Sequence, residues 1–287
     1  MDRMEPTTAG LIETNGVDLW VETFGAPGDP AVVLISGADS PGSRWDLGLV
    51  GAIVRARFRV VCFDNRDCGL STKIDADELY TLDDMARDVV GLMDALVIDR
   101  AHVVGRSMGG MIGQVLALDH SDRVRSLALL ITSPGMGDER LPRPAAEFLD
   151  ALAARHLEPP PKTHDERVEY LVELFRLYAG TAVAFDEARL RIACAAEVDR
   201  MWYPESGHSH AAWSTASRVD RLPEIAVPTL IMHGTADPVV PVAHAHRMAA
   251  AIPDNDCWII EGLGHETPAA LTPELADRLL ALFRRAP

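Results

Sequence analysis

The chain alternates between short apolar runs and longer amphipathic stretches, and this alternation predicts its secondary structure. Runs of about five residues rich in Val and Ile are typical of buried strands, whereas apolar residues spaced three and four apart predict helices. The chain opens on a predicted hairpin, because Asn15-Gly16 suits a tight turn between two alternating segments. We expect strands at 11–14, 17–23, 31–35, 58–63, 101–104, 127–132, 228–234 and 257–260, and helices at 45–57, 81–96 and 111–118.

Strands that alternate with helices indicate a mostly parallel sheet with helices on both faces. We therefore expect an α/β fold around an eight-stranded sheet. Local signals agree with this reading, since Thr81 and Asp84 form a capping box at the start of the helix 81–96. Ligands of such a sheet bind at the carboxyl ends of its strands, where the candidate residues below fall.

The alternation breaks at about Pro134 and resumes at Val227, with a helical pattern between them. We expect 1–134 to form the first part of the core, 135–221 a helical cap and 222–287 the second part of the core. The cap holds half of the chain's 16 aromatic residues, which predicts an apolar, partly aromatic pocket. Its expected helices are 145–155, 163–178, 185–202 and 209–218, and its candidate substrate contacts are Phe175, Trp202, Trp213 and His208.

A serine flanked by glycines is the strongest chemical signal in the chain. Ser107 lies in Gly105-Arg106-Ser107-Met108-Gly109, between a predicted strand and a predicted helix. Such a turn is tight enough that the residues two before and two after the serine must be small. This pattern predicts a nucleophile exposed at the end of the sheet.

The partners of a serine nucleophile follow it in the expected order, an acid and then a histidine. Asp237 lies just past the strand 228–234, and His265 lies past the strand 257–260 in a glycine-containing loop. An imidazole takes the serine's proton, and a buried carboxylate fixes its tautomer and stabilises its charged form. We expect backbone N–H groups of Met108 and Ala38 to form the oxyanion hole.

Composition narrows the classes of partner. The 287 residues carry a formal net charge of −16, which disfavours nucleic acid and anionic membranes. No stretch has the apolar length of a membrane span, and the first residues lack the apolar core of a signal peptide. The four scattered cysteines include no C-x-x-C, which argues against a zinc site or a disulfide framework. We expect a cytoplasmic monomer or homodimer without cofactor or metal, acting on a small hydrophobic ester.

Several of these residues have alternative readings. Asp237 before Pro238 also suits a helix N-cap, and Asp138 is a more distant candidate for the acid. His208 and His210, two apart, suggest a metal pair or a substrate contact, but no further ligands are evident, which favours solvated cap residues. We expect Arg106 to form a structural salt bridge rather than to meet an anionic substrate group. The charged segment 64–67 is expected to be a structural loop beneath the site.

Together, the serine elbow, the Asp237 loop, the His265 loop and the helical insertion resemble the α/β-hydrolase fold family over essentially the whole chain. Four short segments are similar, more narrowly, to the aclacinomycin methylesterases, which tailor anthracycline polyketides. The resemblance implies the same assignments: Ser107 as nucleophile, Asp237 and His265 as its partners, and Ala38 and Met108 as oxyanion donors. Arg106 departs from the pattern, since relatives often have a smaller, neutral residue there. The four segments are 17–20, 99–105, 117–120 and 185–186.

The sequence thus predicts a serine hydrolase that cleaves a carboxylic ester, with a methyl ester of a bulky polyketide as the substrate that the resemblance implies. Dehalogenase and epoxide hydrolase activities need a carboxylate nucleophile in the elbow, so Ser107 argues against both. A carbon–carbon bond hydrolase and a cofactor-free perhydrolase or haloperoxidase remain as alternatives, because each uses the same triad. A non-catalytic binding protein of this fold is the alternative from another class.

Overall fold

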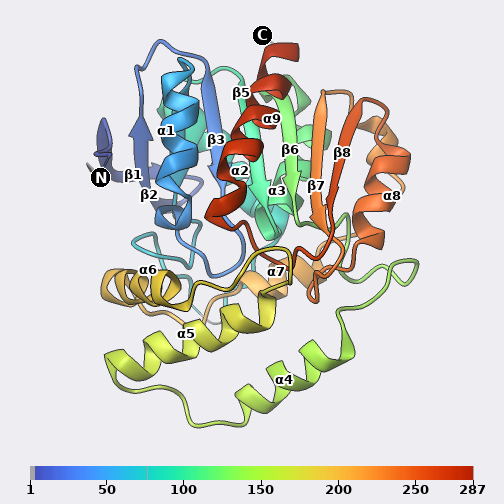
Figure 1. Cartoon of the computed structure of the whole chain (residues 1–287). Helices are drawn as coiled ribbons and strands as arrows, with labels where there is room; N and C mark the ends of the chain where they lie inside the picture. Colours follow the sequence, from blue (N-terminus) through green and yellow to red (C-terminus); the bar gives the residue numbers. More distant parts are fainter. Residues whose placement is uncertain (1–3, 76, 287) are drawn as a thin grey trace.

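The computed structural model describes residues 4–75 and 77–286, and its centre is an eight-stranded sheet (Figure 1). The strand order is β1-β2-β4-β3-β5-β6-β7-β8. The pairs β1–β2 and β2–β4 are antiparallel and all others are parallel, so the predicted mostly parallel sheet is confirmed. The strands are β1 (Thr8–Thr14), β2 (Val17–Phe24), β3 (Ala31–Ile35), β4 (Arg59–Phe63), β5 (Ala101–Arg106), β6 (Val124–Leu130), β7 (Thr229–Gly234) and β8 (Asn255–Ile260).

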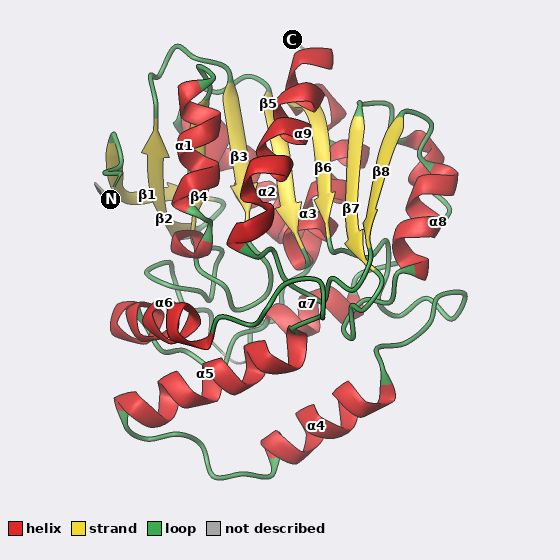
Figure 2. Cartoon of the chain, in the orientation of Figure 1, coloured by secondary structure: helices red, strands yellow, loops and turns green. Residues whose placement is uncertain are grey.

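Helices cover both faces of this sheet (Figure 2). Alternate residues of a strand point to opposite faces, so Val32 and Leu34 pack against α1 and α9, while Val33 and Ile35 pack on the side of α2, α3 and α8. Both faces are apolar, as expected for parallel strands buried on two sides. The core helices are α1 (Leu47–Arg55), α2 (Leu82–Ala95), α3 (Met108–Asp119), α8 (Ala243–Ala251) and α9 (Thr272–Arg285).

Four further helices lie between β6 and β7 in the sequence, and we refer to them as the cap. They gather at the end of the molecule toward which the parallel strands point (Figure 1). Helices α5 and α6 pack on each other through a small apolar cluster that includes Val172 and Cys194. The cap helices are α4 (Ala146–His156), α5 (His164–Tyr178), α6 (Glu187–Arg200) and α7 (His208–Ser214).

Ion pairs join α6 of the cap to the core. The most deeply buried carboxylate in these ion pairs is that of Asp64. It is fully buried and also accepts hydrogen bonds from the backbone N–H groups of Gly42 and Leu70. Its loop is therefore structural, as the sequence suggests. The three pairs are Arg200–Asp64 at 2.7 Å, Arg189–Asp46 at 3.0 Å and Arg44–Glu197 at 3.3 Å.

The last cap helix is shorter than the sequence pattern predicts, since it ends at Ser214 rather than at Arg218. Beyond Ser214 the chain turns back to the core, where the Arg218 N–H donates to the carbonyl of Pro134 at 2.8 Å. This tertiary contact replaces the helical hydrogen bond that Arg218 would otherwise make. The predicted capping box at Thr81 is present, and Thr163 and Glu166 form a second one at the start of α5.

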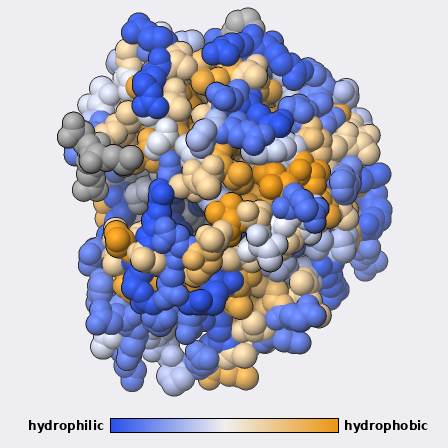
Figure 3. Space-filling view, in the orientation of Figure 1, coloured by the Kyte–Doolittle hydropathy of each residue, from blue (hydrophilic) through white to orange (hydrophobic). Residues whose placement is uncertain are grey.

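Hydrophilic residues predominate over much of the molecular face in Figure 3, and apolar residues show near its middle and in smaller patches toward its edges. Within the part of the chain that the structure describes, no helix has the length and apolar character needed to cross a membrane.

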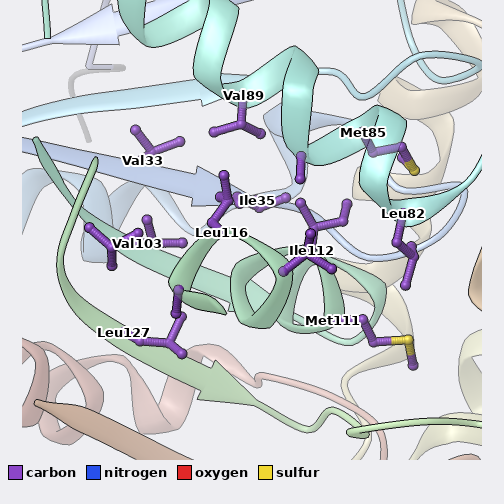
Figure 4. Close-up of a cluster of buried hydrophobic side chains, with 14 of the residues drawn as sticks. Val33, Ile35, Leu82, Met85, Val89, Val103, Met111, Ile112, Leu116 and Leu127 are labelled. Carbon is purple, nitrogen blue, oxygen red and sulfur yellow. The ribbon is translucent and has the colours of Figure 1, made fainter. Parts of the chain in front are cut away.

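The larger apolar core cluster fills the space between the sheet and helices α2 and α3 (Figure 4). Val33, Ile35 and Val103 project from neighbouring strands, and Ile112 and Leu116 of α3 project toward them. All five side chains are at most 1% exposed. This packing fixes α3 beneath the sheet, and with it the turn that joins β5 to α3.

Candidate active site

Ser107 lies at the sharp turn between β5 and α3, in a backbone conformation that few residues adopt. Its φ is 53° and its ψ is −122°, a strained region for any residue with a Cβ. The flanking glycines are required by close packing: a Cβ on Gly105 would lie 2.2 Å from the Gly109 carbonyl oxygen, and one on Gly109 would lie 2.1 Å from that of Ile35. The turn therefore presents the Ser107 hydroxyl at the carboxyl end of the sheet.

A continuous hydrogen-bond chain joins Ser107, His265 and Asp237. The Ser107 hydroxyl lies 2.9 Å from His265 Nε2, and His265 Nδ1 lies 2.8 Å from Asp237 Oδ2. A proton on Nδ1 that bonds to the carboxylate leaves Nε2 free to accept the serine proton. The structure thus brings together three residues that are far apart in the sequence: Asp237 comes 130 residues after Ser107, and His265 comes 28 residues after Asp237.

Asp237 serves two purposes, one for each carboxylate oxygen. Oδ2 faces His265, while Oδ1 accepts the N–H groups of Val239 and Val240 at 2.9 and 2.8 Å. Burial opposes ionisation of this carboxyl, but His265, the neighbouring His233 and the Val240 N–H outweigh burial and lower its pKa. The alternative of Asp237 as a helix N-cap is wrong, because the next helix, α8, begins at Ala243 and has Val242 at its N-cap, so the bonds to Val239 and Val240 hold a turn.

His233, near the end of β7, is a member of this network that the sequence analysis missed. It is fully buried, its Nε2 lies 2.7 Å from the Val240 carbonyl oxygen, and the same nitrogen lies 3.4 Å from Asp237 Oδ2. Burial lowers the pKa of His233, so the ring is neutral and donates from Nε2. The sequence does hold a signal for His233. It is a polar residue in an otherwise apolar buried strand, and it lies four residues before Asp237.

The loop after β3 lies against the serine. A Cβ built on Gly37 would be 3.2 Å from the Ser107 Cβ and 3.7 Å from its hydroxyl oxygen. The next residue is Ala38, which is exposed, and Met108 follows Ser107 at the start of α3. Among the residues that the structure describes, neither the Ala38 N–H nor the Met108 N–H has a hydrogen-bond partner. Neither N–H is therefore taken up by another acceptor in the described part of the chain.

The end of helix α5 holds the loop that carries His265. The His265 N–H donates to the Tyr178 carbonyl at 2.7 Å, and the Gly180 N–H donates to Glu266 Oε1 at 3.1 Å. The N–H groups of Thr181 and Ala182 both donate to the Gly262 carbonyl, at 2.6 and 2.9 Å. The position of the histidine thus depends on the position of the cap.

Three aromatic side chains of the cap form a group beside His265. The Tyr178 ring packs edge-on against His265 with 5.6 Å between ring centroids, and Phe175 and Phe148 lie 5.7 and 5.9 Å from Tyr178. Phe175 is therefore one ring removed from the histidine. Tyr178 is the nearest of them, although the sequence analysis did not single it out as a substrate contact.

Trp202 and Trp213 lie elsewhere in the cap. Trp202 packs edge-on against Tyr170 at 5.7 Å and borders the apolar cluster of α5 and α6, so its role there is to join cap helices. Trp213 on α7 is 45% exposed. Trp202 lies two residues beyond the end of α6, and among the described residues neither tryptophan ring is paired with His265.

His208 differs from the solvated cap residue that the sequence favours. Its side chain is fully buried, its Nδ1 accepts the Asp39 N–H at 2.8 Å, and its Nε2 lies 2.6 Å from the Arg66 carbonyl oxygen. Because both ring nitrogens are used by the backbone, the ring joins α7 to two core loops and has no nitrogen left for a substrate or a metal. In the described ranges, no group of three or more His, Cys, Asp or Glu residues has the arrangement of a metal site.

The expected salt bridge of Arg106 is also absent, since no carboxylate among the described residues lies within ion-pair distance of it. Its guanidinium instead donates to the hydroxyls of Ser40 at 2.7 Å and Thr267 at 3.4 Å, and lies 5.5 Å from the centroid of the Trp45 ring. The reason is tertiary: the turn directs Arg106 between the loop after β3 and the loop after His265, where the side chains are hydroxyls and an aromatic ring.

Comparison with known proteins agrees with this architecture. The sequence profile of a family described as alpha/beta hydrolase fold matches residues 30–179. The chain is 32% identical to Rhodomycin D methylesterase DnrP of Streptomyces peucetius, over 96% of this chain and 98% of that protein. It is also 32% identical to the putative carbamate hydrolase RutD of Variovorax paradoxus, over 86% and 89% respectively. A meta-cleavage product hydrolase from Pseudomonas fluorescens superposes with a TM-score of 0.78 at 23% identity, covering 97% of this chain and 98% of that one, and so shares the fold.

Proposed function

The chain belongs to the α/β-hydrolase fold family, and from that premise we propose that it hydrolyses carboxylic esters through an acyl-enzyme on Ser107. The observation that carries the proposal is the hydrogen-bond chain from the Ser107 hydroxyl through His265 to Asp237, beside two unpartnered backbone N–H groups. A nucleophile, a base, an orienting acid and oxyanion donors are together what acyl transfer needs.

In the first half of the reaction, Ser107 Oγ attacks the ester carbonyl while His265 Nε2 takes the hydroxyl proton. The N–H groups of Met108 and Ala38 hold the resulting oxyanion, each donor stabilising the transition state by about 3 kcal/mol. Collapse of this intermediate breaks the bond to the alcohol, and His265 returns its proton to the leaving oxygen. Asp237 stabilises the imidazolium throughout.

In the second half, water attacks the acyl carbonyl and His265 takes one of its protons. The second tetrahedral intermediate releases the carboxylic acid, and the proton on His265 goes back to Ser107 Oγ. No group beyond the side chains and backbone named here is needed to balance the reaction.

For the substrate, we propose a methyl ester on a bulky fused-ring acyl group of the anthracycline type. Two features support it: the similarity to the rhodomycin D methylesterases, and the ring of Tyr178 against His265 with Phe175 and Phe148 behind it. Aromatic side chains bind flat apolar groups at roughly 25 cal/mol for each Å² of apolar surface buried. Binding energy from remote rings also helps to position the reacting carbonyl.

A second candidate is the hydrolysis of a carbamate. The equal 32% identity to a putative carbamate hydrolase favours it, and the same attack on a carbonyl carbon would serve. A carbamate has a nitrogen on the carbonyl carbon where a carboxylic ester has a carbon, so comparing the turnover of the two kinds of substrate distinguishes the two proposals.

The test combines labelling with turnover. A fluorophosphonate probe is expected to label the wild-type protein and Ser121→Ala, which removes an exposed serine, but not Ser107→Ala. Ser107→Ala should lower kcat on any accepted ester by about 10⁴-fold or more without loss of folded structure. Near-normal turnover by that variant would exclude the acyl-enzyme mechanism.

The substrate proposal needs its own comparison. Methyl anthraquinone-2-carboxylate should show a much higher kcat/KM than methyl acetate or an aryl methyl carbamate. Equal values for the large and small methyl esters would refute the fused-ring proposal and leave ester hydrolysis intact. Preference for the carbamate would support the second candidate instead.

A further inference from the structure

Two arginines lie beside the proposed nucleophile, and neither is needed for the chemistry described above. Arg106 directly precedes Ser107, and its guanidinium bonds to Ser40, two residues beyond Ala38, and to Thr267, two residues beyond His265. It therefore lies between the two loops that flank the serine and the histidine. Only two of its N–H donors have partners among the residues that the structure describes.

Arg44 approaches the same region from the loop before α1. Its guanidinium lies 4.1 Å above the ring of Phe175, which is in contact with Tyr178 beside His265. Its side chain is 13% exposed and pairs with Glu197 of α6 at 3.3 Å. Arg44 thus contacts the cap, and its charge is close enough to Arg106 to lower the pKa of that guanidinium.

The charges in this region do not balance. Glu197 pairs with Arg44 at 3.3 Å, whereas Arg106 bonds, among the described residues, only to the hydroxyls of Ser40 and Thr267, so these three side chains carry two positive charges and one negative charge. Burial and the charge of Arg44 lower the pKa of Arg106 to about 10, yet this still leaves the guanidinium protonated at neutral pH. Charged groups removed from water are normally paired, and a chain with a formal net charge of −16 has many carboxylates to offer.

We propose that Arg106, with Arg44 behind it, forms an anion subsite beside Ser107 that binds a carboxylate carried by the ester substrate. The bound carboxylate supplies the counter-charge that the protein leaves out, and a guanidinium with free N–H donors suits it geometrically. The inference rests on the proposed esterase function and deepens it: the substrate carries a carboxylate on its acyl group, as the half-ester of a diacid does, and the experiment includes esters with the acid on the alcohol as the contrasting case.

The experiment compares pairs of esters that differ only in charge. On the acyl side, the p-nitrophenyl half-esters of succinate, glutarate and adipate are each compared with the same p-nitrophenyl ester in which a neutral carboxamide replaces the free carboxylate. On the alcohol side, 4-carboxyphenyl butyrate is compared with 4-carbamoylphenyl butyrate. Each pair gives a charge preference, the ratio of kcat/KM for the anionic ester to kcat/KM for the neutral one, in wild type, Arg106→Gln, Arg106→Lys and Arg284→Gln.

We expect at least one acyl-side pair to show a preference of about tenfold or more in the wild-type protein, lowered about tenfold by Arg106→Gln and partly kept by Arg106→Lys. Arg284→Gln removes an exposed arginine from the far end of α9 and should change nothing (Figure 1). A merely structural Arg106 would alter both members of a pair equally and leave the ratio unchanged.

A wild-type protein that shows no charge preference in any acyl-side pair would overturn the proposal without any variant, as would a preference that survives Arg106→Gln. High salt should also weaken the preference in the wild-type protein, which provides a check if Arg106→Gln does not fold. Turnover of the neutral esters reports separately on the esterase function, since its loss in Ser107→Ala is independent of the charge ratio.

Discussion

Substitution of Gly180 by alanine should displace His265 through the cap, because Gly180 lies where helix α5 meets the histidine loop. A Cβ at this position would be 2.1 Å from the Gly262 carbonyl oxygen and 2.3 Å from the Gly264 nitrogen, both backbone atoms. Ordinary contact begins at 3.4 Å, so the two segments must separate by roughly 1 Å. The third nearest atom, the Leu263 carbonyl carbon at 2.7 Å, also belongs to the backbone, so the closest contacts are with rigid atoms.

The cost follows from the contacts that this separation disturbs. The hydrogen bonds from Gly180 to Glu266 and from His265 to Tyr178 are each worth about 1 kcal/mol, and overpacking typically costs about 1–3 kcal/mol. We expect the free energy of unfolding to fall by about 2 kcal/mol. A displacement of about 1 Å at a catalytic group can cost about 10²-fold in rate, so kcat should fall between about ten- and a hundredfold.

The assay measures kcat on a small neutral ester at a temperature where circular dichroism shows both proteins fully folded. Labelling by the fluorophosphonate probe should slow in parallel, because His265 must activate Ser107 for either reaction. Gly137→Ala is the matched control, since its Cβ would meet only the Trp213 carbonyl oxygen at 3.6 Å. Gly180→Ala with wild-type kcat and an unchanged Tm would refute the coupling between cap and histidine.

Three further predictions concern the core, the acid and metals. Burial and the charges of Arg125 and Arg100 lower the pKa of His102 from 6.5 to about 4 in the folded protein. The contribution of the neutral ring to the free energy of unfolding is therefore complete above pH 6.5, and about 3 kcal/mol of it is lost as the pH falls from 6.5 to 4. Urea unfolding of His102→Gln should therefore depend less on pH over that range than unfolding of the wild type, and equal slopes would contradict this. Asp237→Asn should lower kcat by about 10⁴-fold while the protein stays folded; full activity would point to another acid. Incubation with EDTA should leave activity unchanged, and loss that zinc restores would show a metal requirement that the described residues do not explain.

Local interactions explain why much of the fold could be predicted from the sequence. The alternation of apolar runs and amphipathic stretches predicted the eight strands, because parallel strands buried on both faces need continuous apolar residues. Capping boxes at Thr81 and Thr163 fixed helix starts through side chains three residues apart. The elbow could be recognised for the same reason, since the conformation of Ser107 requires small residues at 105 and 109.

Other features depended on contacts between segments far apart in the chain, and the tertiary structure decided them. The sequence could not show that α5 would hold the His265 loop, that Tyr178 would be the ring beside it, or that His208 would be buried with both nitrogens bonded. Arg106 illustrates the reason. Its position before Ser107 was evident from the sequence, but its neighbours come from loops about 66 and 161 residues away, and their packing decided that it would meet hydroxyls rather than a carboxylate.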